Sequence, residues 1–189
     1  MDKKELRTEY LQIRKNIPDE IRKEESENIT EELLKLIKEN SFSAVLLYAS
    51  KKYEVDIMGV FDRINLPVYF PRCDKDEMDF YEVDDLSKLR LGNFNVREPE
   101  DGCPLFIPKE NEKYLIAVPG IVFDVNGYRI GYGKGYYDKY LSRFEGYDFY
   151  KAGVCFKECI IKDTFHEDFD IKTDTVIYKK TITLGGTIF

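Results

Sequence analysis

Residues 114–138, YLIAVPGIVFDVNGYRIGYGKGYYD, join a short apolar run to a glycine-rich turn. The run YLIAVP (114–119) is typical of a buried parallel strand, because it is apolar throughout instead of alternating. Gly127, Gly131, Gly133 and Gly135 follow in close succession, and a helix is expected over about 136–145. A strand that leads through a turn into a helix is typical of an α/β domain, so this stretch indicates the fold class.

The flanking sequence continues this alternation of helices and strands. Apolar residues at helical spacing predict helices over residues 2–15 and from Pro18 to about Asn40, and another helical segment after Glu54. Residues 92–112 hold two glycines and three prolines and are expected to form a loop. Further apolar or alternating runs predict strands at 44–49, 66–70, 78–83, 150–156 and 174–178, and an edge strand at 181–185. We therefore expect an α/β fold, a three-layer α/β/α sandwich with a mainly parallel, Rossmann-like sheet.

The composition indicates a globular chain. Its 189 residues suit one compact domain over 1–189 better than two small ones, and 43% of them are apolar and 34% charged. No stretch is long and apolar enough to cross a membrane, and the N-terminus lacks an apolar signal core, so a cytoplasmic protein is expected. The net charge of −7 argues against nucleic-acid binding, which needs a basic surface. A small anionic ligand held by a local basic cluster remains compatible with this charge.

The cysteines and the single histidine limit the chemistry further. Of the four cysteines, only Cys155 and Cys159 are close in sequence, and Cys-x₃-Cys without nearby histidines is a poor zinc pattern. Free buried thiols are therefore expected. His166 is the only histidine, which excludes mechanisms that need a histidine pair, and we expect it at the surface.

The glycine-rich turn has the residue types that hold a phosphate. Glycines let backbone N–H groups approach a phosphate closely, and the N-terminus of the following helix favours negative charge. Lys134 adds a charge that can meet a transferring phosphoryl group, and Asp138, in the first helical turn, could hold a metal ion. GYGKG is neither a Walker A loop nor a dinucleotide-binding GxGxxG. A tight turn with a solvent-exposed lysine is the alternative interpretation.

Beyond these local features, the sequence resembles the 5-formyltetrahydrofolate cyclo-ligases, also called methenyltetrahydrofolate synthetases. The matching motifs are PG (119–120), FD (123–124), Gly127, Arg129 and GYGKGYYD (131–138). The resemblance extends over most of the chain, to KKELR (3–7), ASKKYEVD (49–56), GNFNVREP (92–99) and FDIKTD (169–174).

The resemblance implies a ligase that uses ATP and Mg²⁺ to convert 5-formyltetrahydrofolate to 5,10-methenyltetrahydrofolate, through an iminium phosphate intermediate. Its ATP-binding residues, carried over to matching positions, are Lys3, Lys4, Arg7, Arg129, Ile130, Gly131, Tyr132, Gly133, Lys134, Gly135, Tyr136 and Tyr137. Its folate-binding residues are Ala49, Glu54, Tyr132, Gly133, Lys134, Gly135 and Tyr136. Lys134 is assigned to catalysis, and Asp138 and Asp170 to magnesium. No obligate protein partner is implied.

The sequence departs from the family pattern at several points. Tyr132 stands where many members have arginine, and Ile57 replaces the usual threonine after Glu-Val-Asp. The C-terminal segment lacks the usual proline, so Asp174 and Asp168 remain alternatives to Asp170. Two other functions also remain open: another small-molecule enzyme on a similar fold, such as a sugar-phosphate isomerase or CoA transferase, and a nucleotide- or folate-binding regulator without turnover.

Overall fold

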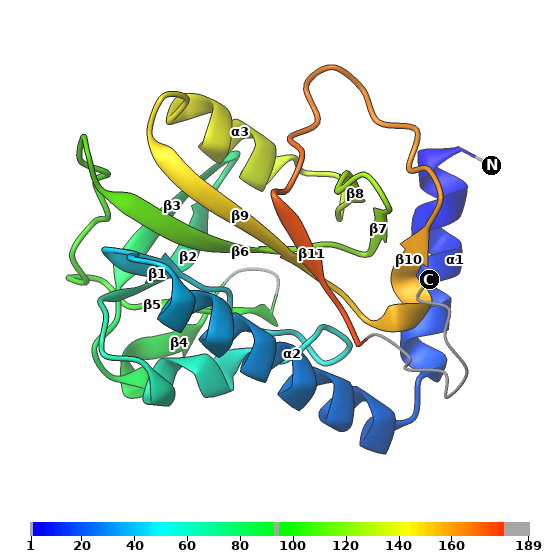
Figure 1. The fold of residues 1–189 in the computed structure, drawn as a ribbon, viewed down its shortest axis with the longest axis horizontal. Coiled ribbons are helices and arrows are strands. Elements are labelled where there is room, and N and C mark those ends of the chain that lie inside the picture. The colour runs from blue at the N-terminus through cyan, green and yellow to red at the C-terminus, as the bar shows by residue number, and fades with distance from the viewer. Residues whose placement is uncertain (1, 93–94, 180–189) are drawn as a thin grey trace.

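The computed structural model describes residues 2–92 and 95–179, and its centre is a six-stranded sheet of order β11-β9-β6-β1-β2-β3 (Figure 1). Its strands are β1 (Ala44–Leu46), β2 (Val68–Asp74), β3 (Glu77–Glu82), β6 (Lys113–Pro119), β9 (Asp148–Val154) and β11 (Thr175–Ile177). Neighbouring strands are parallel, except that the edge strand β3 runs antiparallel to β2. The predicted α/β fold with a mainly parallel sheet is confirmed.

Strand β6 lies between β1 and β9 and supplies core residues to both faces of the sheet. Leu115 and Ala117 belong to one buried cluster, whereas Ile116 and Val118 belong to the other. This alternation follows from the period of two along a strand. A strand that is apolar throughout is therefore explained by a sheet that is covered on both sides.

One helix covers each face of the sheet. Helix α2 (Asp19–Glu39) packs its apolar stripe, including Ile29 and Leu33, into the cluster that contains Leu115. Helix α3 (Tyr136–Arg143) packs Tyr140 and Leu141 into the opposite cluster, with residues of β3. The expected three-layer α/β/α arrangement is thereby confirmed.

Helix α1 (Lys3–Asn16) lies beside β10 in Figure 1, against a second, three-stranded sheet. That sheet has the order β10-β7-β8, with β7 (Val122–Asp124), β8 (Arg129–Ile130) and β10 (Ile160–Ile161). Asp2 caps the helix, since its side chain accepts hydrogen bonds from the amides of Lys4 and Glu5. Leu6 packs on Val122 and Ile130, so this short sheet fixes α1 beside the end of β6.

Some local expectations held only in part. The helical segment expected after Glu54 is present as a 3₁₀ helix, η1 (Met58–Arg63). The expected loop 92–112 contains β5 (Arg97–Pro99), which pairs antiparallel with β4 (Leu89–Leu91). Two further 3₁₀ turns are η2 (Leu86–Lys88) and η4 (Lys157–Cys159). These elements are too short to show a period of apolar residues. The expected edge strand 181–185 lies outside the described residues.

The cysteines are free thiols, as expected, although only Cys155 and Cys159 are buried. Burial raises the pKa of both thiols, so they remain protonated and unreactive. Within the described part of the chain, no helix has the length and apolar content needed to cross a membrane.

Candidate active site

A cavity of about 330 Å³ opens beyond the carboxyl ends of β1 and β6. We call it the strand-end cavity. The predicted site residues that line it are Ala49, Glu54, Arg129, Gly131, Tyr132, Lys134, Gly135, Tyr136, Tyr137 and Asp138. Ligands of open α/β sheets bind at the carboxyl ends of strands, so this cavity is the candidate active site.

Residues 131–135, the glycine segment, form one wall of the cavity with every residue except Gly133, and lead into α3. Gly133 and Gly135 have φ angles of +92° and +66°, which residues with a Cβ rarely adopt. Gly135 is the N-cap of α3 and provides no side-chain hydrogen bond, so the first amides of the helix stay available to a ligand. Lys134 is exposed at the cavity and has no ion pair among the described residues.

The N-terminal basic residues have different surroundings. The Nε atom of Arg7 donates to the carbonyl oxygen of Gly131 at 2.9 Å, which brings Arg7 to the glycine segment. Lys3 instead forms ion pairs with Asp170 at 2.6 Å and Glu167 at 2.8 Å. Burial lowers the pKa of Lys3, but the two carboxylates outweigh this effect and raise it. Lys4 is exposed. None of the three cations lines the cavity.

The predicted residue Ile130 belongs to the core. Its side chain is buried and packs with Leu6 and Val122. Its carbonyl oxygen accepts a hydrogen bond from the amide of Ile121 at 2.8 Å. Ile130 therefore supports the turn before the glycine segment, and its side chain faces no ligand.

Glu54 places a buried carboxylate in the cavity. Its Oε1 atom accepts from the hydroxyl of Tyr132 at 2.7 Å, and its Oε2 atom accepts from the amide of Lys51 at 2.9 Å. Burial and the charge of Glu54 raise the pKa of Tyr132, so its hydroxyl stays a donor. A carboxylate can accept about four hydrogen bonds, so Glu54 retains capacity for a ligand.

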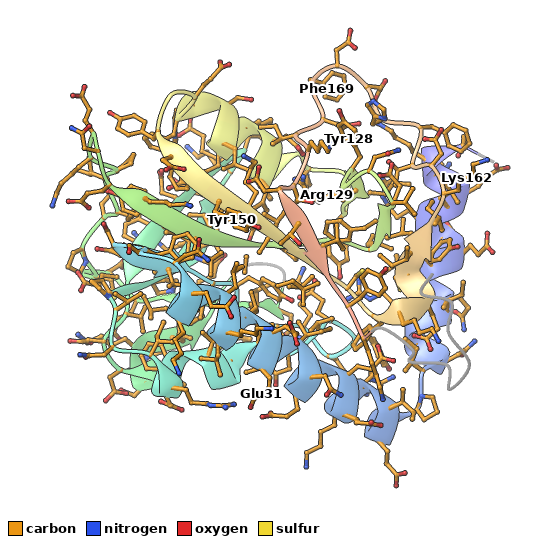
Figure 2. The ribbon with its side chains drawn as sticks, viewed as in Figure 1. Glu31, Tyr128, Arg129, Tyr150, Lys162 and Phe169 are labelled. Carbon is orange, nitrogen blue, oxygen red and sulfur yellow. The ribbon has the colours of Figure 1, made fainter. Side chains whose placement is uncertain are left out.

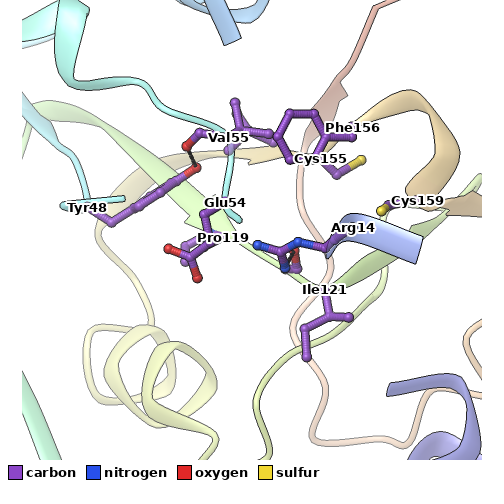
Figure 3. A pocket seen from close by; sticks show the side chains of 11 residues that line it. Arg14, Tyr48, Glu54, Val55, Pro119, Ile121, Cys155, Phe156 and Cys159 are labelled. Carbon is purple, nitrogen blue, oxygen red and sulfur yellow. Dashed lines mark hydrogen bonds between the residues drawn. The ribbon is translucent and has the colours of Figure 1, made fainter. Parts of the chain in front are cut away.

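Arg14 and Glu54 both line a smaller pocket of about 10 Å³, which is too small for a substrate (Figure 3). Arg14 donates to the carbonyl oxygen of Tyr53 at 2.7 Å and to that of Gly120 at 3.3 Å. It therefore ties α1 to the segments that follow β1 and β6, and this small pocket has a structural role.

The two predicted metal ligands lie on neighbouring segments. Arg129, a buried residue labelled in Figure 2, donates to Oδ1 of Asp138 and to the carbonyl oxygen of Ile171, both at 3.1 Å. The same Oδ1 atom accepts from the amide of Ile171 at 3.1 Å. Because Ile171 follows Asp170 directly, these bonds bring the segment of Asp170 to the start of α3.

The second oxygen of each carboxylate is available to a cation. Among the described residues, the donors to Asp138 all bond its Oδ1 atom, and the donors to Asp170 all bond its Oδ2 atom. Carboxylate oxygens are the ligands that Mg²⁺ prefers, so these side chains fit such an ion. Asp174 instead accepts from the amide of Lys151 and pairs with its ammonium group, and Asp168 is exposed. Asp170 differs from Asp174 in its place next to Ile171, whose amide donates to Asp138.

Comparisons with known proteins identify the family of this chain. The 5-formyltetrahydrofolate cyclo-ligase family profile matches residues 1–179. The chain belongs to this family. It is therefore an enzyme of the cyclo-ligase family, and the predicted resemblance is confirmed.

Individual relatives extend the comparison. A probable 5-formyltetrahydrofolate cyclo-ligase of Caenorhabditis elegans is 28% identical over 202 residues, which cover 98% of each chain. A probable cyclo-ligase of Schizosaccharomyces pombe is 32% identical over 104 residues, which cover 50% of this chain and 51% of that protein. The NMR structure of Aquifex aeolicus 5,10-methenyltetrahydrofolate synthetase has a TM-score of 0.80 at 33% identity, and covers 94% of this chain and 90% of that one.

A second group of possible metal ligands lies outside the cavity of this cyclo-ligase. Ligand atoms of Asp124, Asp163 and His166 lie within 4.8 Å of one another. Asp124, however, already accepts four hydrogen bonds, from the amides of Asn126, Tyr128 and Thr164 and the hydroxyl of Thr164. His166 is exposed, as expected, and its ring stacks on Tyr128 at 3.6 Å. This group joins the β7–β8 turn to the loop after β10.

The sequence did not predict every residue of the cyclo-ligase cavity. The lining residues that it missed are Tyr48, Lys51, Pro71, Cys73, Met78, Val96, Glu98 and Pro119. Most lie on or beside β1, β2, β3 and β5, far from the glycine segment in sequence. Four of them had a usable signal, because they lie inside the family-like segments 49–56, 92–99 and 119–120: Lys51, Val96, Glu98 and Pro119.

Proposed function

We propose that this chain catalyses the ATP- and Mg²⁺-dependent cyclisation of 5-formyltetrahydrofolate to 5,10-methenyltetrahydrofolate, with release of ADP and phosphate. The observation that carries the proposal is the strand-end cavity, which places Glu54 opposite the glycine segment and the first turn of α3. A carboxylate suits the N–H groups of a pteridine, and the helix start suits phosphates. We further propose that residues 1–189 act as one domain in the cytoplasm.

The reaction needs ATP because the N5 formyl group is an amide. Its carbon is a poor electrophile, and its oxygen is a poor leaving group. In the proposed mechanism, the formyl oxygen attacks the γ-phosphate and ADP leaves, which gives an iminium phosphate. N10 then adds to the activated carbon, its proton is lost, and phosphate departs as the five-membered ring closes.

The residues of the cavity have distinct proposed roles. Lys134 and the free amides at the start of α3 stabilise the charge of the phosphoryl group. Glu54 accepts hydrogen bonds from the pteridine and positions it for phosphoryl transfer. Asp138 and Asp170 would hold Mg²⁺, which when bound neutralises phosphate charge. Burial and the nearby charge of Glu98 raise the pKa of Cys73 to about 11, so this thiol is not expected to act as a nucleophile.

The direct test follows formation of the methenyl product by its absorbance. Purified protein should convert 5-formyltetrahydrofolate only when ATP and Mg²⁺ are both present. Binding of both ligands without product would support a regulator instead. Turnover of sugar phosphates or CoA thioesters without ATP would support another α/β enzyme.

Arg7→Ala is expected to raise the KM for ATP at least several-fold, and to change the KM for folate less. Arg7 contacts the glycine segment through Gly131, and hydrogen bonds of charged groups contribute about 1.5–3 kcal/mol. The measurement is steady-state kinetics with each substrate varied. Lys15→Ala is the matched control, because Lys15 is an exposed cation in the last turn of the same helix. Equal KM values for ATP in both variants would remove Arg7 from the ATP site.

Asp138→Asn is expected to raise the Mg²⁺ concentration for half-maximal activity by about tenfold or more, because the site loses a charged oxygen ligand. The variant also leaves Arg129 less well paired, so its thermal melting is measured beside the titration. Asp79→Asn is the control, since Asp79 is an aspartate that pairs with an arginine, Arg143, and does not line the cavity. A magnesium curve that overlays that of the wild type would rule out Asp138 as a ligand.

A further inference from the structure

Two side-chain polar atoms are buried without a hydrogen-bond partner in the described part of the chain, and both are hydroxyls on α3. They belong to Tyr137 and Tyr140. A buried hydroxyl that makes no hydrogen bond destabilises a protein, so each requires an explanation. The two differ in one respect: Tyr137 lines the strand-end cavity, whereas Tyr140 packs in the core with Phe80 and Phe144.

Tyr137 lines the cavity, and its hydroxyl oxygen is buried in the free protein. Its ring packs edge-on against Phe80, with centroids 6.2 Å apart, and the Arg129 guanidinium lies 5.9 Å from the ring centroid. Burial, and then the charge of Glu54 in the same cavity, raise the pKa of Tyr137. The hydroxyl therefore keeps its proton and is a donor without an acceptor.

The polarity of this wall favours a neutral acceptor over a phosphate. Met78 and Pro71 line the cavity beside β2 and β3, and Arg129 is already paired with Asp138. The unpaired cation and free amides that phosphates prefer lie in the glycine segment and at the start of α3. A neutral donor on an apolar wall suits a carbonyl oxygen, which occurs in the pteridine ring and in the formyl group of the folate.

We propose that the Tyr137 hydroxyl donates a hydrogen bond to a carbonyl oxygen of the bound reduced folate. This inference rests on the proposed function. It gives Tyr137 a role towards folate, whereas the sequence resemblance assigned this residue to ATP. Tyr137 thus holds the folate from the side of α3, while Glu54 accepts hydrogen bonds from the side of β1.

A Tyr137 hydroxyl that binds folate and one that only supports the fold differ in their expected effects on stability and affinity. The hydroxyl is unpaired in the free protein and paired in the complex. Its removal should therefore leave the free protein as stable as before or more stable, and weaken folate binding. A residue that only supports the fold would lose stability and affinity together.

The test compares Tyr137→Phe with Tyr140→Phe, because both changes remove an unpaired buried hydroxyl from the same helix. Thermal melting of the free proteins and titration calorimetry with 5-formyltetrahydrofolate, with and without ADP, are the measurements. We expect unchanged or higher Tm for both variants, but an approximately tenfold rise in Kd only for Tyr137→Phe. Tetrahydrofolate, which lacks the formyl group, separates the two carbonyls: equal loss for both ligands indicates the ring carbonyl, and loss for 5-formyltetrahydrofolate alone indicates the formyl oxygen.

Several results would overturn the inference. An unchanged Kd for folate in Tyr137→Phe would do so, as would a loss confined to nucleotide binding. A lower Tm or a failure to fold would mean that the hydroxyl is paired in the free protein, which also contradicts the argument. The activity of the wild type is measured first. If it shows no ATP-dependent ring closure, the proposed function is wrong. If the wild type is active and Tyr137→Phe has the same Kd for folate, only the role of Tyr137 is refuted.

Discussion

Lys134→Ala is expected to lower kcat for ATP-dependent ring closure by about 10²-fold or more, with a smaller change in the KM for ATP. Lys134 lies in the glycine segment at the cavity, and the described residues provide no carboxylate partner for its charge. Its charge is therefore free to interact with the phosphoryl group, and this interaction strengthens as the group is transferred. Arg129, by contrast, is paired with Asp138.

Steady-state kinetics at saturating Mg²⁺ would measure this effect, and Lys139→Ala is the matched control. Lys139 is also an exposed lysine, but it lies further along α3 and does not line the cavity. Both variants lose one charge, so a general electrostatic effect would lower their kcat equally. A near-normal kcat for Lys134→Ala would remove this residue from the mechanism.

The main layers could be predicted because each helix or strand carries its own apolar pattern. The continuous apolar run 114–119 predicts a buried strand, and apolar residues at helical spacing predict the buried face of α2. The small sheet of β7, β8 and β10 could not be predicted in this way, since its strands have only two or three residues. Strand β10 is stabilised by pairing with β7, which is distant in sequence, and this pairing leaves no periodic pattern in either segment. Strands β7 and β8 pair with each other, but both are too short to show a period.

The same distinction applies to the site. The segment from Arg129 to Asp138 was predicted as a unit, because its motif is continuous in sequence. The bonds that organise it were not predictable: Tyr132 meets Glu54 from 78 positions away, and Lys3 meets Asp170 from 167 positions away. These contacts depend on the order of the strands in the sheet. A sequence motif can therefore predict which residues form a site, whereas their hydrogen-bond and ion-pair partners are known only from the three-dimensional structure.

Glu54→Gln is expected to raise the KM for 5-formyltetrahydrofolate by about 10- to 100-fold, with a smaller effect on ATP. The carboxylate of Glu54 already accepts from the Tyr132 hydroxyl and the Lys51 amide, and is proposed to accept from the N–H groups of the pteridine. A glutamine has only one acceptor oxygen, so its NH₂ group must face one of these donors. The variant therefore loses a charged acceptor and places two donors against each other.

Glu25→Gln separates this effect from the general cost of changing a buried acid. Glu25 is buried on α2 and accepts from the amide of Lys157 at 3.1 Å, but it does not line the strand-end cavity. Both variants replace a buried carboxylate that accepts a backbone amide, so their Tm values report any shared loss of stability. Only Glu54→Gln should change the KM for folate, because only Glu54 lies where the pteridine is proposed to bind. If the two variants have the same KM, Glu54 supports the loop after β1 and the pteridine lies elsewhere in the cavity.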